Sequence, residues 1–185
     1  MFRNLILVAA PLALLATPAA AQSVTGTIDM TGTVAAKCFV VPGNGSTFSD
    51  SVNFGALDQA DGTMRTGLAT TFGTRNFTVK CNGTNPKVSV TANALATATP
   101  VVAGYDNSID FTASVAVDAV STNAGPFTDS STTGPGSTPT AIGSPLANAA
   151  SNIHVSTSGY ATNNATDLLA VGTYNGSVVV VIAPN

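Results

Sequence analysis

The side chains that could do chemistry are few in this chain of 185 residues. His154 is the single histidine, and it stands between Ile153 and Val155 in a strand-like stretch, so its ring is expected to point away from their buried face. Histidine chemistry usually needs a second placed group. All nine acidic residues are aspartate, and the sequence contains no motif typical of a hydrolase, a P-loop or a dinucleotide fold. We therefore predict that the protein is not an enzyme and binds no cofactor.

Two aspartates in the stretch LDQADG have a spacing that faintly resembles a calcium-binding loop. A calcium loop would need further oxygen ligands after Asp58 and Asp61, ending in a bidentate glutamate. The sequence has no glutamate at all. We expect a solvated turn here and no metal site.

The first 21 residues have the pattern of a secretory signal peptide. A single arginine is followed by the apolar run from Leu5 to Leu15 and by small residues that end in an A-x-A arrangement. Cleavage is predicted between Ala21 and Gln22, and the segment is too short for a membrane span. We expect an exported chain of one domain, with no membrane-spanning segment.

Cys38 and Cys81 are the two cysteines of the chain. An even count in an exported protein is most simply explained by one disulfide, whereas a zinc or redox site would need more ligands or a CxxC pair.

The whole chain has six basic and nine acidic residues without a basic patch, which argues against nucleic acid as a partner.

Alternating apolar residues, rather than a helical period, organise most of the remaining sequence. The expected strands are 48–54, 76–81, 87–94, 108–117, 153–157 and 174–182. The last of these becomes apolar on both faces, which favours a central strand. Residues 121–150 are rich in Ser, Thr, Gly and Pro and are expected to form a long surface excursion, with a short edge hairpin as one possibility. This pattern predicts an all-β protein with a single antiparallel β-sandwich.

The stretch SVTGTIDMTGTV, residues 23–34, also alternates strictly. Its even positions carry the apolar side chains and the glycines, and its odd positions carry threonine and aspartate. This period predicts a strand with one buried face, although the segment precedes the body of the domain. The even positions are Val24, Gly26, Ile28, Met30, Gly32 and Val34.

Three stretches together resemble a known family. TGTIDMTGTVAAKCFV, followed about forty residues later by NFTVKC, and the terminal GTYNGSVVVVI are similar to subunits of chaperone-usher pili, including the spore coat U-like subunits. The resemblance covers the first part of the exported chain and its last strand well, and the middle poorly. The terminal IAPN differs from the family, in which an aromatic residue often stands next to the last position.

The resemblance implies an immunoglobulin-like β-sandwich that lacks its final strand. A periplasmic chaperone would fill the gap temporarily, and the N-terminal extension of a neighbouring subunit would fill it permanently, after secretion through an outer-membrane usher. Val24, Gly26, Ile28, Met30 and Gly32 would then form the donor strand. Val178, Val180 and Ile182 would line the groove that accepts it.

The sequence accordingly predicts a signal peptide in residues 1–21, a donor-strand extension in 22–34 and a pilin-like sandwich in 35–185. The expected function is that of a structural subunit of an extracellular pilus, supporting adhesion or biofilm formation, with other copies of itself or related subunits as partners. The alternative is a secreted binding module for a carbohydrate or surface ligand. In that module, the N-terminal strand would complete its own domain.

Overall fold

The computed structural model describes residues 24–185, so the predicted signal segment lies outside the described residues. The chain divides into two compact units at the boundary between Val34 and Ala35, and each is described by itself. The described part of the first unit, residues 24–34, contains no helix or strand, and its residues are exposed. The second unit, residues 35–185, contains every element described below.

The regular secondary structure of the second unit is almost entirely β-strand, which confirms the all-β prediction. One short helix, α1, precedes the second strand. The elements in chain order are β1 (Cys38–Val41), α1 (Leu68–Phe72), β2 (Arg75–Cys81), β3 (Lys87–Ala96), β4 (Tyr105–Asp106), β5 (Ser108–Val117), β6 (Ala124–Ser130), β7 (Thr140–Ala141), β8 (Ile153–Ala161), β9 (Leu168–Leu169) and β10 (Asn175–Ala183).

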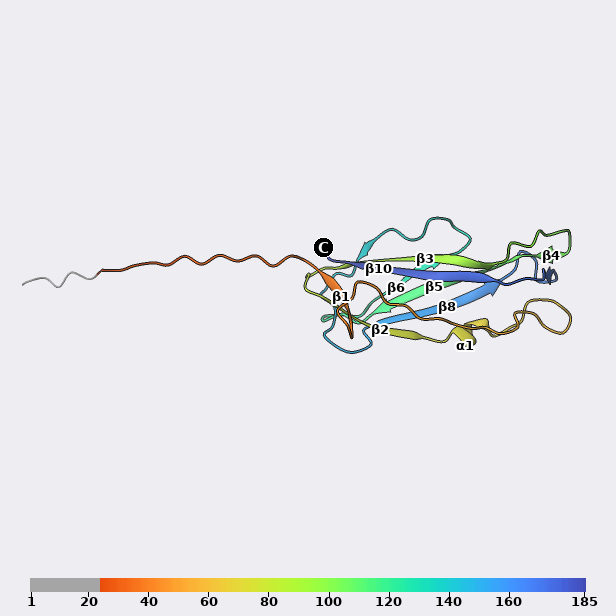
Figure 1. Cartoon of the computed structure of the whole chain (residues 1–185), viewed down its shortest axis with the longest axis horizontal. Coiled ribbons are helices and arrows are strands. Elements are labelled where there is room, and N and C mark those ends of the chain that lie inside the picture. Colours follow the sequence, from red (N-terminus) through yellow and green to blue (C-terminus); the bar gives the residue numbers. More distant parts are fainter. Residues whose placement is uncertain (1–23) are drawn as a thin grey trace, which may run out of the picture. The chain divides into compact units, whose positions relative to one another are not determined.

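The main sheet has the strand order β1-β2-β8-β5-β3-β10, with antiparallel neighbours throughout (Figure 1). β6 pairs with β5, and β7 pairs with β3, while β4 and β9 form a small parallel pair. β5 pairs with β3 only around Ile109 and with β6 from Thr112 onward. The sheet therefore divides at β5 and folds over itself into a sandwich-like arrangement.

Alternate side chains of the long strands form the core. In β3, Val88, Val90 and Ala92 are buried, and their neighbours in sequence are at least partly exposed. The same period of two holds in β5 and at the start of β8, as the sequence predicts. The buried members of these two strands are Ile109, Phe111, Ala113, Val115, Val117, Ile153 and Val155.

Residues 48–54, predicted as a strand, are not in a regular strand in this structure. Phe48 packs its ring on Phe77 of β2, with 4.3 Å between the ring centroids, and Phe54 contacts Tyr160 of β8. The apolar alternation is therefore used for side-chain packing. A strand also needs a backbone partner, which this segment does not have in the described part of the chain.

The prediction that the last strand is central is wrong for the single chain. β10 pairs with β3 and stands at the edge of the sheet formed by the described residues. Its inward row is half-buried, while Val179 and Val181 on the other face are 46% and 52% exposed. A strand with apolar residues on both faces therefore does not need a partner strand on both of its edges.

Residues 121–150 are more ordered than the sequence predicts. They contain β6 and β7, and two of their side chains, Ile142 and Leu146, are buried in the main core. The low-complexity composition hides these two anchors, because isolated apolar residues carry no periodic signal.

Candidate functional site

A groove of about 1010 Å³ lies beside β10. Consecutive residues 48–58 line one part of it, and consecutive residues 169–178 line another. In Figure 1, the segment that contains residues 48–58 leaves β1 and continues along the length of the sandwich. The groove therefore follows an edge strand rather than forming a round pocket.

The deeper part of the groove is lined by apolar and aromatic side chains. Phe111 of β5 stacks on Tyr160 of β8 with 5.3 Å between ring centroids, and Phe54 meets the same tyrosine edge-on at 5.9 Å. Phe77 and Val155 also line this space. Such a lining favours an apolar occupant over a charged one, because buried charges need partners.

β10 contributes Val178 and Val180, two of the three predicted groove residues, directly to the lining. The third, Ile182, lies further along the strand and packs against the main core cluster without lining the groove. All three belong to the same inward row. Since β10 pairs with β3 alone among the described strands, its other edge offers backbone groups beside the groove.

An ion pair lies at the groove lining. The guanidinium of Arg75 is 3.5 Å from the carboxylate of Asp50, and it also lies over the ring of Phe72, 5.7 Å from the centroid. Both charged side chains are partly exposed. This pair links β2 to the irregular segment that borders the groove.

The predicted donor residues lie in the first unit and make no regular structure there. The side chains of Val24, Ile28 and Met30 are 92%, 88% and 91% exposed. Gly26 and Gly32 have open space around them, so that a Cβ at either position would have no neighbouring atom within 4 Å. Three large apolar side chains thus share the even positions of one short segment without burial.

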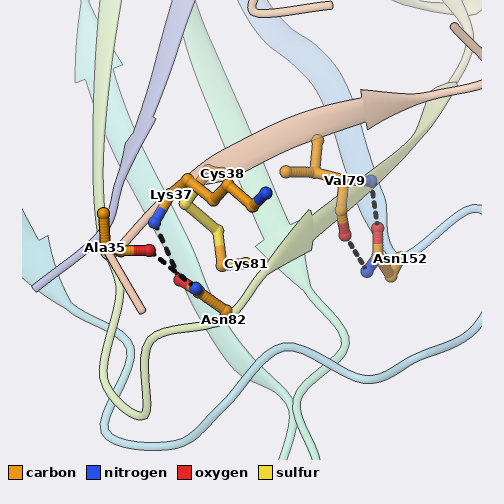
Figure 2. Close-up of a disulfide and its surroundings, with 7 residues drawn as sticks. All are labelled: Ala35, Lys37, Cys38, Val79, Cys81, Asn82 and Asn152. Carbon is orange, nitrogen blue, oxygen red and sulfur yellow. Dashed lines mark hydrogen bonds between the residues drawn. A yellow bond between two sulfur atoms is a disulfide. The ribbon is translucent and has the colours of Figure 1, made fainter. Parts of the chain in front are cut away.

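The disulfide predicted between Cys38 and Cys81 is present and joins β1 to β2 (Figure 2). Beside it, the Asn82 amide donates to the carbonyl of Ala35 at 2.9 Å, and its oxygen accepts from the backbone N–H of Lys37 at 2.7 Å. These bonds fix the first residues of the second unit to the end of β2. No motif in the sequence signals this role of Asn82.

Asn152 is a buried polar residue that sequence reasoning missed. It is fully buried, and its side chain bonds the N–H and carbonyl of Val79 at 2.9 and 2.7 Å, as Figure 2 shows. It also donates to the carbonyl of Ala147 at 2.8 Å. The Asn152 side chain therefore takes the place of backbone hydrogen bonds between β2 and the chain just before β8. A single polar residue has no periodic pattern in the sequence, so sequence reasoning could not identify this role.

His154 is partly buried and tied to two neighbours rather than free in solvent. One ring nitrogen lies 2.7 Å from the Asn76 amide oxygen, and the other lies 3.2 Å from an Asp118 carboxylate oxygen. These contacts connect β8 to β2 and to the end of β5. The arrangement includes no serine or cysteine nucleophile hydrogen-bonded to the ring among the described residues.

The Asp58–Asp61 loop forms the expected turn. Asp61 accepts bonds from the backbone N–H and hydroxyl of Thr63 at 3.0 and 2.7 Å, and the hydroxyl bond is the main reason that the pKa of Asp61 is lowered. Within residues 24–185, no group of three metal-ligating side chains comes together. The same residues contain no helix of the length and apolarity that crossing a membrane requires.

Two tyrosine hydroxyls support the groove wall. The Tyr174 hydroxyl lies 2.9 Å from the carbonyl of Ala170 and 3.1 Å from that of Asp106, so it ties the start of the last strand to nearby backbone. Burial raises the pKa of Tyr174, and the nearby Asp106 carboxylate raises it further. Burial also raises the pKa of Tyr160, whose hydroxyl is 2.9 Å from that of Thr157.

Comparisons with protein-family models, with curated proteins and with solved structures found no match for this chain. The functional argument therefore depends on the groove, on the edge of β10 and on the alternating N-terminal segment.

Proposed function

We propose that the protein is a structural subunit of an extracellular pilus of the chaperone-usher type, assembled by donor-strand exchange. The observation that carries this proposal is the groove of about 1010 Å³, with apolar and aromatic side chains in its deeper part, beside the edge of β10 that has no partner among the described strands. An immunoglobulin-like sandwich without its final strand would have such a groove. A strand inserted there would cover the groove and make β10 a central strand, as its composition predicts.

The occupant proposed for this groove is the even face of residues 24–30 from another copy. Val24, Ile28 and Met30 are almost fully exposed in the single chain, and burying them should contribute roughly 1.5 to 3 kcal/mol each. The inserted backbone would also bond to the free edge of β10, as in other cases of β-augmentation. Gly26 would pass where the groove is shallow.

Repeated insertion produces a fibre. The donor segment and the acceptor groove are different surfaces of the same chain, so the contact is heterologous and each added subunit presents a new groove. A periplasmic chaperone would cover the groove before assembly, and an outer-membrane usher would secrete the subunits. The resulting pilus would serve adhesion or biofilm formation at the cell surface.

The experiment that tests this function compares two charged substitutions at neighbouring positions, Ile28→Asp and Thr27→Asp. Ile28→Asp places a charge among the apolar side chains of the groove and removes an apolar side chain, which should cost several kcal/mol. Thr27→Asp leaves its charge in water and should cost well under about 1 kcal/mol. Polymers that resist unboiled denaturing gels should disappear for Ile28→Asp and persist for Thr27→Asp.

Folding of the subunit itself should be equal in the two variants, because residues 27 and 28 lie outside the second unit and its core. Thermal unfolding of the chaperone-released monomer checks this. Equal polymer formation by the two variants would contradict the donor-strand role. Loss of the folded monomer in Ile28→Asp alone would instead favour a strand that completes its own domain.

A further inference from the structure

The second unit has two ends, which we call proximal and distal. The proximal end is the one where the bonds of Asn82 hold Ala35 and Lys37 and where Gly83 lies against the C-terminal Asn185. The distal end is formed by the β4–β9 pair and by the loop 58–64, which bonds to β9 through Gly62 and Leu169. Figure 1 shows the C-terminus and β4 at opposite ends of the second unit.

The proximal end carries positive charge. Lys37 is exposed beside the disulfide, Lys80 is exposed at the end of β2, and Lys87 begins β3 opposite Ala183 of β10. These are all the lysines of the chain. The carboxylate of Asp118, which follows β5 toward this end, is 3.2 Å from the ring of His154.

The distal end carries negative charge. Asp58 and Asp61 are exposed in the loop 58–64, and Asp167 is partly exposed just before β9. The basic residue that follows this loop, Arg65, directs its guanidinium to the carbonyl of Phe54 at 2.9 Å. The distal carboxylates are therefore not neutralised by an ion pair with Arg65.

The distal end also exposes apolar side chains. Val102 and Val171 are 69% and 87% exposed, and Val101 and Tyr105 are close to half exposed. The loops are tied together, since the Thr99 hydroxyl donates to the carbonyl of Val171 at 2.6 Å. At the proximal end, a shallow hollow of about 250 Å³ is lined by Phe39, Lys80, Cys81, Asn82 and Leu146 among others.

The direction of strand insertion determines which ends meet. β10 runs from the distal to the proximal end, because Asn175 pairs with Ala96 and Ala183 with Lys87. If the donor strand runs antiparallel to β10, its last residue lies at the distal end of the acceptor subunit. The chain then continues into the proximal end of the donor subunit, so that a distal and a proximal end meet. A parallel donor strand would bring two proximal, lysine-bearing ends together.

The connection between donor and domain is short. Four residues, 31–34, separate Met30 from Ala35, and a fully extended chain of this length spans about 14 Å. This upper limit is longer than the screening length of about 10 Å at 0.1 M salt, but it is well within the length of about 30 Å at 0.01 M salt. Charges on the two facing ends would therefore interact at low ionic strength.

We propose that consecutive subunits also contact each other end to end, with the proximal end of the donor subunit against the distal end of its acceptor. This inference rests on the proposed function. Lys37, Lys80 and Lys87 face Asp58, Asp61 and Asp167, and the exposed valines are covered by the neighbouring copy. Charge complementarity thereby selects the antiparallel direction of insertion and the head-to-tail order of the fibre.

The test uses charge reversals at two exposed residues that do not line the groove, Lys80→Glu and Asp61→Lys. Polymerisation of the purified full chain is followed by light scattering, at low and at high salt. Each reversal should slow assembly about tenfold at low ionic strength, and the difference should shrink toward 1 M salt, where screening reduces the range to about 3 Å. A chain carrying both reversals should recover most of the wild-type rate.

Two controls separate end contacts from other effects. Lys80→Arg keeps the charge, and Ser158→Glu adds a charge on an exposed position of β8, so both should assemble at the wild-type rate. Wild-type rates for both single reversals at low salt, or failure of the double reversal to recover, would overturn the end-to-end contact.

Binding of a synthetic peptide of residues 24–34 to each variant distinguishes this inference from the proposed function. The peptide has no proximal end, so both reversals should bind it as tightly as the wild type does. Unchanged peptide binding with slowed assembly supports the end contact. Unchanged peptide binding with unchanged assembly overturns the end contact alone, and a peptide that fails to bind the wild-type groove overturns both.

Discussion

At the scale of single residues, polar side chains replace backbone pairing at the places where strands diverge. Asn152 bonds to both backbone groups of Val79, and the Asp129 carboxylate accepts the backbone N–H of Ala92 at 2.8 Å. Each such bond satisfies a group whose burial without a partner would cost about 1 to 3 kcal/mol. Isolated polar residues of this kind give the sandwich a specific register.

Tyr160 and Tyr174, which line the groove, are expected to make the free energy of unfolding fall at alkaline pH. The folded state raises the pKa values of Tyr160 and Tyr174, so it favours the neutral phenols. The corresponding stability is present below the unfolded value of about 10 and is lost as pH rises through the folded values. We expect the free energy of unfolding, measured with urea, to begin to fall above about pH 10 and to keep falling as the folded-state phenols ionise.

The double variant Tyr160→Phe/Tyr174→Phe should be less stable than the wild type at neutral pH, because its hydroxyl bonds are gone, but should lose less stability on the alkaline side. Tyr105→Phe, which removes a tyrosine hydroxyl from a side chain that is 44% exposed, is the matched control. An identical alkaline decline in the double variant and the wild type would contradict this explanation.

At the scale of elements, the disulfide connects the short edge strand β1 to β2. β1 has four residues and pairs with β2 in a register that places Cys38 opposite Cys81. Such a short strand gains little from its own ladder. The covalent link and the Asn82 bonds therefore hold the point at which the N-terminal segment joins the domain.

Removing the disulfide should strongly destabilise the second unit. The two cysteines are 43 residues apart, and closing a loop of that size contributes about 4 kcal/mol in the chain-entropy model. Cys38→Ser/Cys81→Ser, which leaves no unpaired thiol, should lower the free energy of unfolding by about 4 kcal/mol. Urea denaturation measures this as a lower midpoint concentration. The reduced wild type serves as the control, and a midpoint equal to that of the oxidised protein in either sample would refute the prediction.

At the scale of the whole molecule, the chain separates its two proposed assembly surfaces into different units. The core clusters draw all their buried residues from the second unit, and the exposed alternating segment lies in the first. A fold that does not depend on its own donor segment can use that segment in a neighbour. The groove beside β10 is the surface that such a neighbour would complete.

Deleting residues 22–30 should therefore remove assembly without removing the fold. The truncated subunit should keep the far-UV spectrum and thermal unfolding of the full chain when released from the proposed chaperone, but it should not extend a fibre. Its intact groove should still accept the 24–34 peptide. Normal fibres from the truncated chain would contradict the donor assignment, and loss of the folded subunit would favour the self-completed module.

Much of the fold could be predicted because its signals are local. Period-two alternation determined β2, β3, β5 and β8 and identified their buried rows, since neighbouring side chains on a strand must point to opposite faces. The pairing of Cys38 with Cys81 followed from the cysteine count in a chain with a predicted export signal. Val178 and Val180 line the hollow beside β10, and their role in accepting a donor strand stays a prediction.

Only the tertiary structure determines which strand edges have no partner strand and which polar side chains take the place of backbone hydrogen bonds between strands. The sequence predicted a central last strand and a strand at residues 48–54, yet β10 stands at the edge of the described sheet and the other segment packs only through its side chains. Strand formation depends on side chains that are adjacent in sequence, whereas strand neighbours, Asn152 and the charged ends depend on residues that meet only after folding. Alternation reports burial, and only the folded chain shows where a partner strand is absent.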